Sequence, residues 1–150
     1  MLRRGIPLKP TCEVATDTED ITIHTGRQLV TDVTAQVKEF CRDKADGLCH
    51  AFLPHATAGL ALIETGSGSE ADLASALDRM MPRGGGYLHR HGSAGHGRDH
   101  LLPAFVCPSL VLAVREGAVV LGTWQTVVVV DTNVDNTERH LLLSFLRSPS

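Results

Sequence analysis

This chain of 150 residues has few aromatic residues and only a small excess of negative charge. It also lacks long apolar runs. Phe, Trp and Tyr together make up 4% of it, which argues against stacking platforms for nucleic-acid bases. The formal net charge is -3, so there is no electrostatic reason to bind a nucleic-acid backbone. We therefore expect no nucleic acid among its partners.

Membrane and disulfide signals are also missing. No run of about 18 apolar residues occurs, and the arginine-containing residues 1–14 hold no apolar stretch of signal-peptide length. The four cysteines lie far apart without C-x-x-C spacing: Cys12, Cys41, Cys49 and Cys107. Free thiols are the default in such a chain. We expect a cytoplasmic protein that makes no contact with a membrane.

The chain is large enough for one domain with a real core. Hydrophobic residues make up 43% of it, and two domains of half this length would each be marginal. We expect a single domain over residues 1–150, with residues 1–10 as a loose amino-terminal arm.

Hydrophobic periodicity predicts about eight strands and two helices. Residues 11–25 are typical of a hairpin, and helical spacing predicts helices over residues 27–44 and 69–82, the second with Ser69 as N-cap. Short apolar runs predict the other strands, over residues 48–55, 59–65, 101–106, 109–114, 118–130 and 139–146. Runs of strands without strict alternation with helices favour an α+β sandwich with helices on part of one face.

Four of the eight histidines gather in one segment, YLHRHGSAGHGRDH, among glycines and small or polar residues. They are His89, His91, His96 and His100. Neutral imidazole is a good ligand for zinc and similar divalent ions, and a catalytic site typically has three protein ligands and an open position. The segment is either a solvated, flexible loop or part of a metal site, and the clustering favours a metal site.

Other polar residues stand at strand junctions. His55 lies in the turn PHATAG, whereas the isolated histidines are interpreted as surface or core residues: His24, His50 and His140. Glu64 ends an apolar run and is either a helix-cap partner or a general acid or base.

Three residues near the carboxy terminus have an open interpretation. Gln125 interrupts the most apolar stretch and, if buried there, needs a hydrogen-bond partner. Its neighbour Trp124 is either core filler or part of a site. Arg139 is either a surface residue or an anion ligand.

These segments together resemble the YjbQ family of small proteins. PHATAGLALIE is similar to its H-T-T-A…E segment, YLH…DH to its Y-x-H…A-H pair, and REGAVVLGTWQTV to its G-x-x-x-x-G-T-W-Q signature. VDNTERHLLLSF resembles its closing G-P-R-x-R strand, so the resemblance covers nearly the whole chain. The departures are Ala56 for the first threonine, Leu102 for a basic residue, and two additional histidines, His91 and His96.

The resemblance implies a jelly-roll-like α+β sandwich, a homotrimer and a metal-type site near the subunit boundary. It implies His55, His89 and His100 as metal ligands, with His91 and His96 as alternates, and a divalent metal, with zinc as the expected ion. Glu64 and Gln125 would be catalytic, and the substrate-binding residues would be Thr57, Trp124 and Arg139.

The activity associated with this family is the synthesis of thiamine phosphate from a pyrimidine diphosphate and a thiazole phosphate, with loss of pyrophosphate. The leading hypothesis is a metal-dependent enzyme that acts in this way on small phosphorylated or anionic substrates. A metal-dependent hydrolase in which Glu64 activates water is the alternative. A metal- or anion-binding module without catalysis and a structural trimer remain as hypotheses of other classes.

Overall fold

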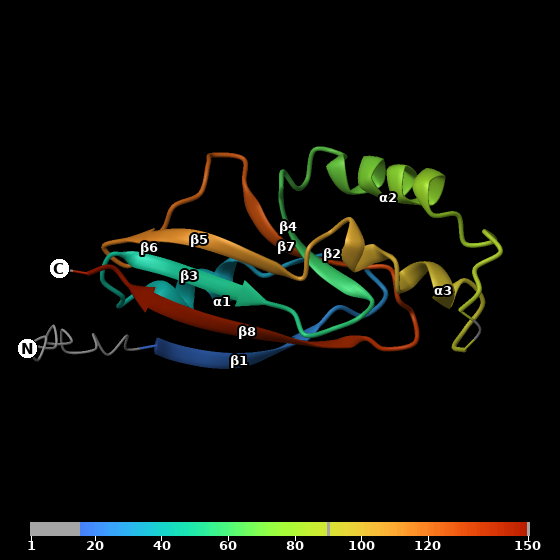
Figure 1. Cartoon of the computed structure of the whole chain (residues 1–150). Helices are drawn as coiled ribbons and strands as arrows, with labels where there is room; N and C mark the ends of the chain where they lie inside the picture. The colour runs from blue at the N-terminus through green and yellow to red at the C-terminus, as the bar shows by residue number, and fades with distance from the viewer. Residues whose placement is uncertain (1–15, 90, 150) are drawn as a thin grey trace, which may run out of the picture.

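Eight strands form two antiparallel sheets in the described part of the chain, residues 16–89 and 91–149 of a computed structural model (Figure 1). The larger sheet has five strands, in the spatial order β1, β8, β3, β5, β6. Their bounds are Thr16–His24 for β1, Glu138–Arg147 for β8, Gly47–Phe52 for β3, Ser109–Arg115 for β5 and Ala118–Val119 for β6.

The first strand corrects one prediction. In place of a hairpin over residues 11–25, β1 pairs with β8 without interruption from Thr16 opposite Leu146 to His24 opposite Glu138. The polar residues 17–20 lie within this strand at the edge of the sheet, where polar side chains can face solvent. Residues 11–15 lie outside the described part of the chain.

The smaller sheet contains the most buried strand. Its order is β2, β7, β4, with bounds Val30–Asp32, Thr126–Asp131 and Ala58–Ile63. Alternate valines of β7 point to opposite faces: Val127 and Val129 face the core between the two sheets, while Val128 and Val130 face the second core under α2. Burial on both faces accounts for four consecutive valines.

The strand predicted over residues 118–130 is divided between the two sheets. It forms β6 in the larger sheet and β7 in the smaller one, joined by residues 120–125 as a projecting loop (Figure 1). Within that loop the amide of Gly122 donates a hydrogen bond of 2.8 Å to Gln125 Oε1. A chain that passes from one sheet to the other cannot keep pairing as one strand.

Helices cover one end and one face of this sandwich. Helix α1 (Thr34–Cys41) is shorter than predicted because residues 30–32 pair as β2, whereas α2 (Ser69–Met80) follows the prediction. Gly68, at a φ of 97°, is the N-cap of α2, so Ser69 is its first helical residue. The strand predicted over residues 101–106 is wrong: Leu102–Ala104 form a short 3-10 helix, η1, whose Pro103 cannot donate to a sheet ladder.

The predicted α+β sandwich with flanking helices is confirmed. Leu77 of α2 and Met81, its C-cap, pack against Val128 and Val130 of β7, which makes the helix a third layer. The chain leaves α2 at one end of the sandwich and forms the one-turn helix α3 (His96–Asp99) there (Figure 1).

Two further predictions concern the amino-terminal residues and contact with a membrane. Residues 1–10, predicted as a loose arm, lie outside the described residues. Among the helices that are described, none combines the length and the apolar character needed to cross a membrane.

Candidate metal centre

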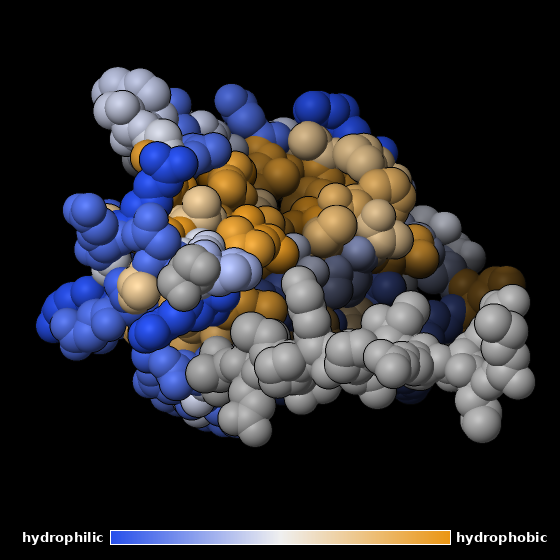
Figure 2. Space-filling view, turned by 60° about the vertical axis from the view of Figure 1, so that its left-hand side comes forward, coloured by the Kyte–Doolittle hydropathy of each residue, from blue (hydrophilic) through white to orange (hydrophobic). Residues whose placement is uncertain are grey.

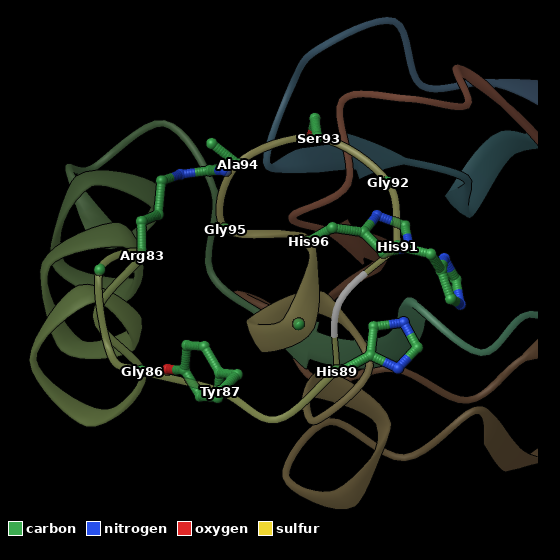
Figure 3. A pocket seen from close by; sticks show the side chains of 12 residues that line it. Arg83, Gly86, Tyr87, His89, His91, Gly92, Ser93, Ala94, Gly95 and His96 are labelled. Atoms are coloured by element: carbon green, nitrogen blue, oxygen red, sulfur yellow. The ribbon is translucent and has the colours of Figure 1, made fainter.

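The four clustered histidines meet at one point. One nitrogen from each imidazole of His89, His91, His96 and His100 lies within 4.8 Å of the others. The Nε2 atoms of His96 and His100 are 3.0 Å apart. The cluster borders a cavity of about 400 Å³, and Figure 3 shows three of its rings around a common space.

The local sequence explains this convergence. His96 and His100 are four residues apart across α3, so they lie on the same side of the helical turn. Gly92 and Gly95 have φ angles of 83° and 87°, which reverse the chain and return His89 and His91 toward that turn. A side chain at Gly92 would also overlap the ring of His96.

A carboxylate at its Nδ1 fixes the orientation of His96, which is 8% exposed. Its Nδ1 lies 3.0 Å from Asp135 Oδ2 and 3.4 Å from Asn133 Nδ2. The amide of Ser93 donates to Asp135 Oδ2 at 3.0 Å and, as the largest effect, lowers the pKa of that carboxyl. A carboxylate beside Nδ1 favours the tautomer that carries its proton there, which leaves the Nε2 lone pair facing His100.

The electrostatics of the cluster favour neutral imidazoles at His89 and His100. Partial desolvation, followed by the neighbouring histidines, lowers the pKa of both His89 and His100. Asp99 lies behind the cluster, wholly buried, with Oδ2 3.9 Å from His96 Nδ1, and burial raises its pKa. Neutral imidazole is the protonation state that binds a metal.

The donor set fits a divalent ion of the zinc type. Zinc–nitrogen bonds of about 2.0 to 2.1 Å in a tetrahedron place ligand atoms about 3.3 Å apart. The separation of His96 and His100 is close to this value, and the spread of all four atoms needs only small ring movements. Three imidazoles would leave an open position, whereas four would close the site.

His55 lies apart from this cluster. Its Nε2 accepts a hydrogen bond of 2.7 Å from the backbone amide of His140, and the two rings stack with centroids 6.1 Å apart. His140 in turn lies 3.1 Å from Asp20, through Nδ1 and Oδ1. Within one chain the fold therefore brings His89 and His100 together with His91 and His96, but not with His55.

Glu64 and Gln125 also lie away from the cavity. Glu64 follows β4 in the loop before α2, where its Oε1 accepts a 2.6 Å hydrogen bond from the hydroxyl of Ser67. Helix α2 has 12 residues and so spans about 18 Å, and the histidine segment follows its far end. Gln125 is exposed in the loop between β6 and β7, beside Trp124, which is 72% exposed.

Arg139 is buried, not exposed to an incoming anion. It is 1% exposed, and its guanidinium forms a bidentate pair with Asp131 through contacts of 2.8 and 3.1 Å. Thr57, also buried, lies at 3.5 Å from Arg139 Nη2. The guanidinium of Arg139 is therefore paired within the protein, and it is not accessible to the anion that it was predicted to bind.

Sequence reasoning missed the partners of His96 and the buried residues of α3. Asp135 and Asn133 follow the buried strand β7, a place where polar side chains often form sites, and that position was the available signal. Arg98 and Asp99 sit between two of the histidines, yet both are buried. Nothing in their spacing distinguishes them from exposed loop residues.

Comparisons with known proteins agree on one family. The family model described as UPF0047 protein YjbQ-like matches residues 19–148. A UPF0047 protein of Mycobacterium tuberculosis is 52% identical over 130 residues, which cover 87% of this chain and 98% of that protein.

Two solved structures are similar over most of the chain. The crystal structure of a YbjQ-like protein from Sulfolobus solfataricus has a TM-score of 0.82 at 27% identity, and covers 91% of this chain and 100% of its own. A hypothetical protein from Aeropyrum pernix has a TM-score of 0.80 at 28% identity, with 88% of this chain and 99% of its own covered.

Proposed function

The chain belongs to the UPF0047 family of YjbQ-like proteins, and on that premise we propose that it is a metal-dependent enzyme acting on small phosphorylated substrates. The observation that carries the proposal is the convergence of four imidazole nitrogens within 4.8 Å. Zinc is the preferred ion because imidazole ligands and tetrahedral geometry suit it.

Three of the histidines are proposed as the permanent ligands. His96 is buried and held by Asp135, His100 lies on the same side of α3, and His89 completes the set from the facing loop. His91 is exposed, as His89 is, but only His89 is among the ligands that the resemblance implies, so His91 is proposed as the imidazole that substrate displaces. A bound divalent ion would act as a Lewis acid and stabilise negative charge on a phosphoryl or leaving pyrophosphate group.

The chain's own residues would bind substrate and move protons. Once displaced from the fourth position, His91 would transfer a proton between substrate and solvent, for which an imidazole is suited near neutral pH. Tyr87 and Arg83 line the same cavity (Figure 3). Glu64, Gln125 and His55 would take part only where an assembly brings them to the cluster of a neighbouring copy.

Condensation of a pyrimidine diphosphate with a thiazole phosphate is the reaction we propose first, with hydrolysis of a phosphate ester as the alternative. A binding role without catalysis has one observation in its favour. All four imidazoles together would complete a tetrahedral shell, and closed shells are typical of structural zinc.

A homotrimer is proposed as the assembled form. The outer face of the larger sheet carries exposed apolar residues on neighbouring strands: Leu48 at 46%, Val111 at 63% and Leu146 at 39% exposure. Figure 2 shows apolar side chains gathered into one area of the surface. Such an area is typical of a contact with another protein surface.

The cytoplasm is the proposed location. Cys41, Cys49 and Cys107 are free thiols, and the first two are buried in the core. Free thiols are typical of a reducing compartment.

Turnover by metal-free and zinc-reconstituted protein tests the proposal. Release of pyrophosphate from the pyrimidine diphosphate and thiazole phosphate, and of phosphate from a simple monoester, would be followed in parallel. We expect zinc-dependent turnover in one assay, its loss in His96→Ala and its retention in His24→Ala, which changes an exposed histidine outside the cluster. Zinc binding without turnover in either assay would support the binding role without catalysis and contradict the proposed enzymatic activity.

A further inference from the structure

A second, smaller cavity lies beside the histidine cluster and has an arginine-rich wall. Its volume is about 180 Å³, and Arg27, Arg83 and Arg98 line it together with Asp78, Asp131 and Asn133. Arg83 also lines the cavity of the histidine cluster, so this residue stands between the two spaces. Arg98 and His96 both come from the single turn of α3.

Arg98 is buried without enough acceptors. The residue is 3% exposed, and its Nη1 donates a 2.5 Å hydrogen bond to Asp78 Oδ1. Its Nε has no hydrogen-bond partner among the described residues, and Asp99 Oδ1 lies 3.8 Å away. A guanidinium has five N–H donors, and leaving them unpaired in a buried position is costly. The cavity wall therefore contains a buried guanidinium that is not fully paired within the protein.

The charges around the cavity favour an anion. Asp131 is already paired with Arg139 through two contacts, so it does not neutralise the wall. The remaining carboxylates near Arg98 are Asp78, which is largely exposed, and the buried Asp99. Three guanidiniums therefore face two carboxylates, and the excess is positive.

We propose that this cavity binds a tetrahedral oxyanion, the phosphoryl group of a substrate or free phosphate, through Arg98 and Arg83. Planar guanidinium donors match the oxygens of a phosphate, and charge-assisted hydrogen bonds are the stronger kind. The volume is below that of a typical cavity for a complete small molecule, so it suits one anionic group.

This inference rests on the proposed function for its substrate and deepens it. A phosphoryl group held by Arg98 and Arg83 would place the rest of the substrate beside Arg83, at the cavity that the histidines border. It also supplies the anion ligand that Arg139, paired with Asp131, does not provide. The phosphate contact itself needs no metal, so it can be tested separately.

Binding of inorganic phosphate to chelator-treated, metal-free protein, measured by isothermal titration calorimetry, is the test. We expect saturable binding that weakens at least about tenfold in Arg83→Gln and Arg98→Gln, because each removes a charge-assisted contact. Arg83 is exposed, so the Arg83→Gln protein is expected to fold even where Arg98→Gln does not. Asp78→Asn removes the anion that competes for Arg98 and should tighten binding.

Arg79→Gln is the matched control, because Arg79 is an exposed arginine of the same helix as Asp78 and lines neither cavity. It should bind phosphate as the wild type does. Equal affinity in Arg83→Gln and Arg79→Gln, or no saturable binding by the wild type, would overturn the inference.

Zinc-loaded protein separates the two sources of the anion, and the two proposals. A phosphate monoester that binds more tightly than phosphate only when zinc is present would identify a substrate that reaches both cavities. Equal affinity for the monoester and for inorganic phosphate would identify free phosphate as the ligand. Phosphate binding that depends on Arg83 in a protein that never retains zinc would support this site and contradict the metal-dependent function.

Discussion

The carboxylate of Asp135 sets how well His96 can act as a ligand. It lies 3.0 Å from His96 Nδ1 and holds the proton on that side of the ring. We expect Asp135→Asn to weaken zinc affinity by about 10- to 100-fold, as measured by competition with a chromogenic chelator. Asp20→Asn, which alters a similar pair with His140, should leave zinc affinity unchanged. Equal losses in both variants would contradict this role.

His55 should make stability depend on pH. Burial, followed by the charge of Arg139, lowers the pKa of His55 below the ordinary 6.5. Its Nε2 accepts the amide hydrogen of His140. The unfolded chain gains a proton below pH 6.5 while the folded protein resists it, so stability is complete above 6.5 and falls as pH decreases below it.

Urea unfolding of metal-free protein at pH 7.5 and 5.5 would measure this effect. His55→Gln keeps an acceptor that does not titrate and should lose less stability than the wild type between these two values. His89 and His100, whose pKa values are also lowered, contribute to the pH dependence of both proteins. An identical loss of stability in the wild type and in His55→Gln would mean that the pKa of His55 is the same in the folded and unfolded states.

Sequence anticipates the residues that the chain brings together locally. The four clustered histidines lie within twelve residues, so a turn and one helical turn suffice to assemble them. The positions of His55, Asp135 and Asn133 depend on contacts between segments that are distant in sequence, which no local spacing encodes. The burial of Arg139 follows from its pairing with Asp131, eight residues earlier on β7 in the other sheet, and no charge pattern revealed it.

At the scale of elements, the tight turn between β5 and β6 is sensitive to substitution. Gly117 has a φ of 78°, and a Cβ there would overlap the backbone oxygen of Arg42 at the end of α1. We expect Gly117→Ala to lower the free energy of unfolding by about 3 kcal/mol, from backbone strain and overpacking together. Gly26→Ala, with a φ of 61° and open space around it, should cost about 1 kcal/mol. Similar losses in denaturant unfolding would contradict the overlap.

Element types were easier to predict than their partners. The periodicity of α2 and the apolar pattern of β8 are local, and both elements formed as predicted. The run of four valines identifies a strand buried on both faces, but its pattern carries no information about which sheet the strand joins. That choice depends on contacts with β2 and β4, which are distant in sequence.

At the scale of the whole molecule, the exposed apolar face of the larger sheet should hold an assembly together. Val111, the most exposed of the three apolar residues named on this face at 63%, is the residue to change. We expect Val111→Lys to convert a trimer into monomers in light scattering, with little loss of monomer stability, since the side chain is already exposed. Met80→Lys, 57% exposed on α2, should leave the trimer intact. A monomeric wild-type protein would contradict the proposed trimer.

Metal content tests the central claim most directly. Inductively coupled plasma mass spectrometry on untagged wild type, His96→Ala, His100→Ala and the control His24→Ala should find about one divalent ion per chain in the wild type and the control. The ion should be absent from the two cluster variants. A wild type that retains no ion after divalent metals have been added back and excess removed would contradict the metal centre and the function built on it.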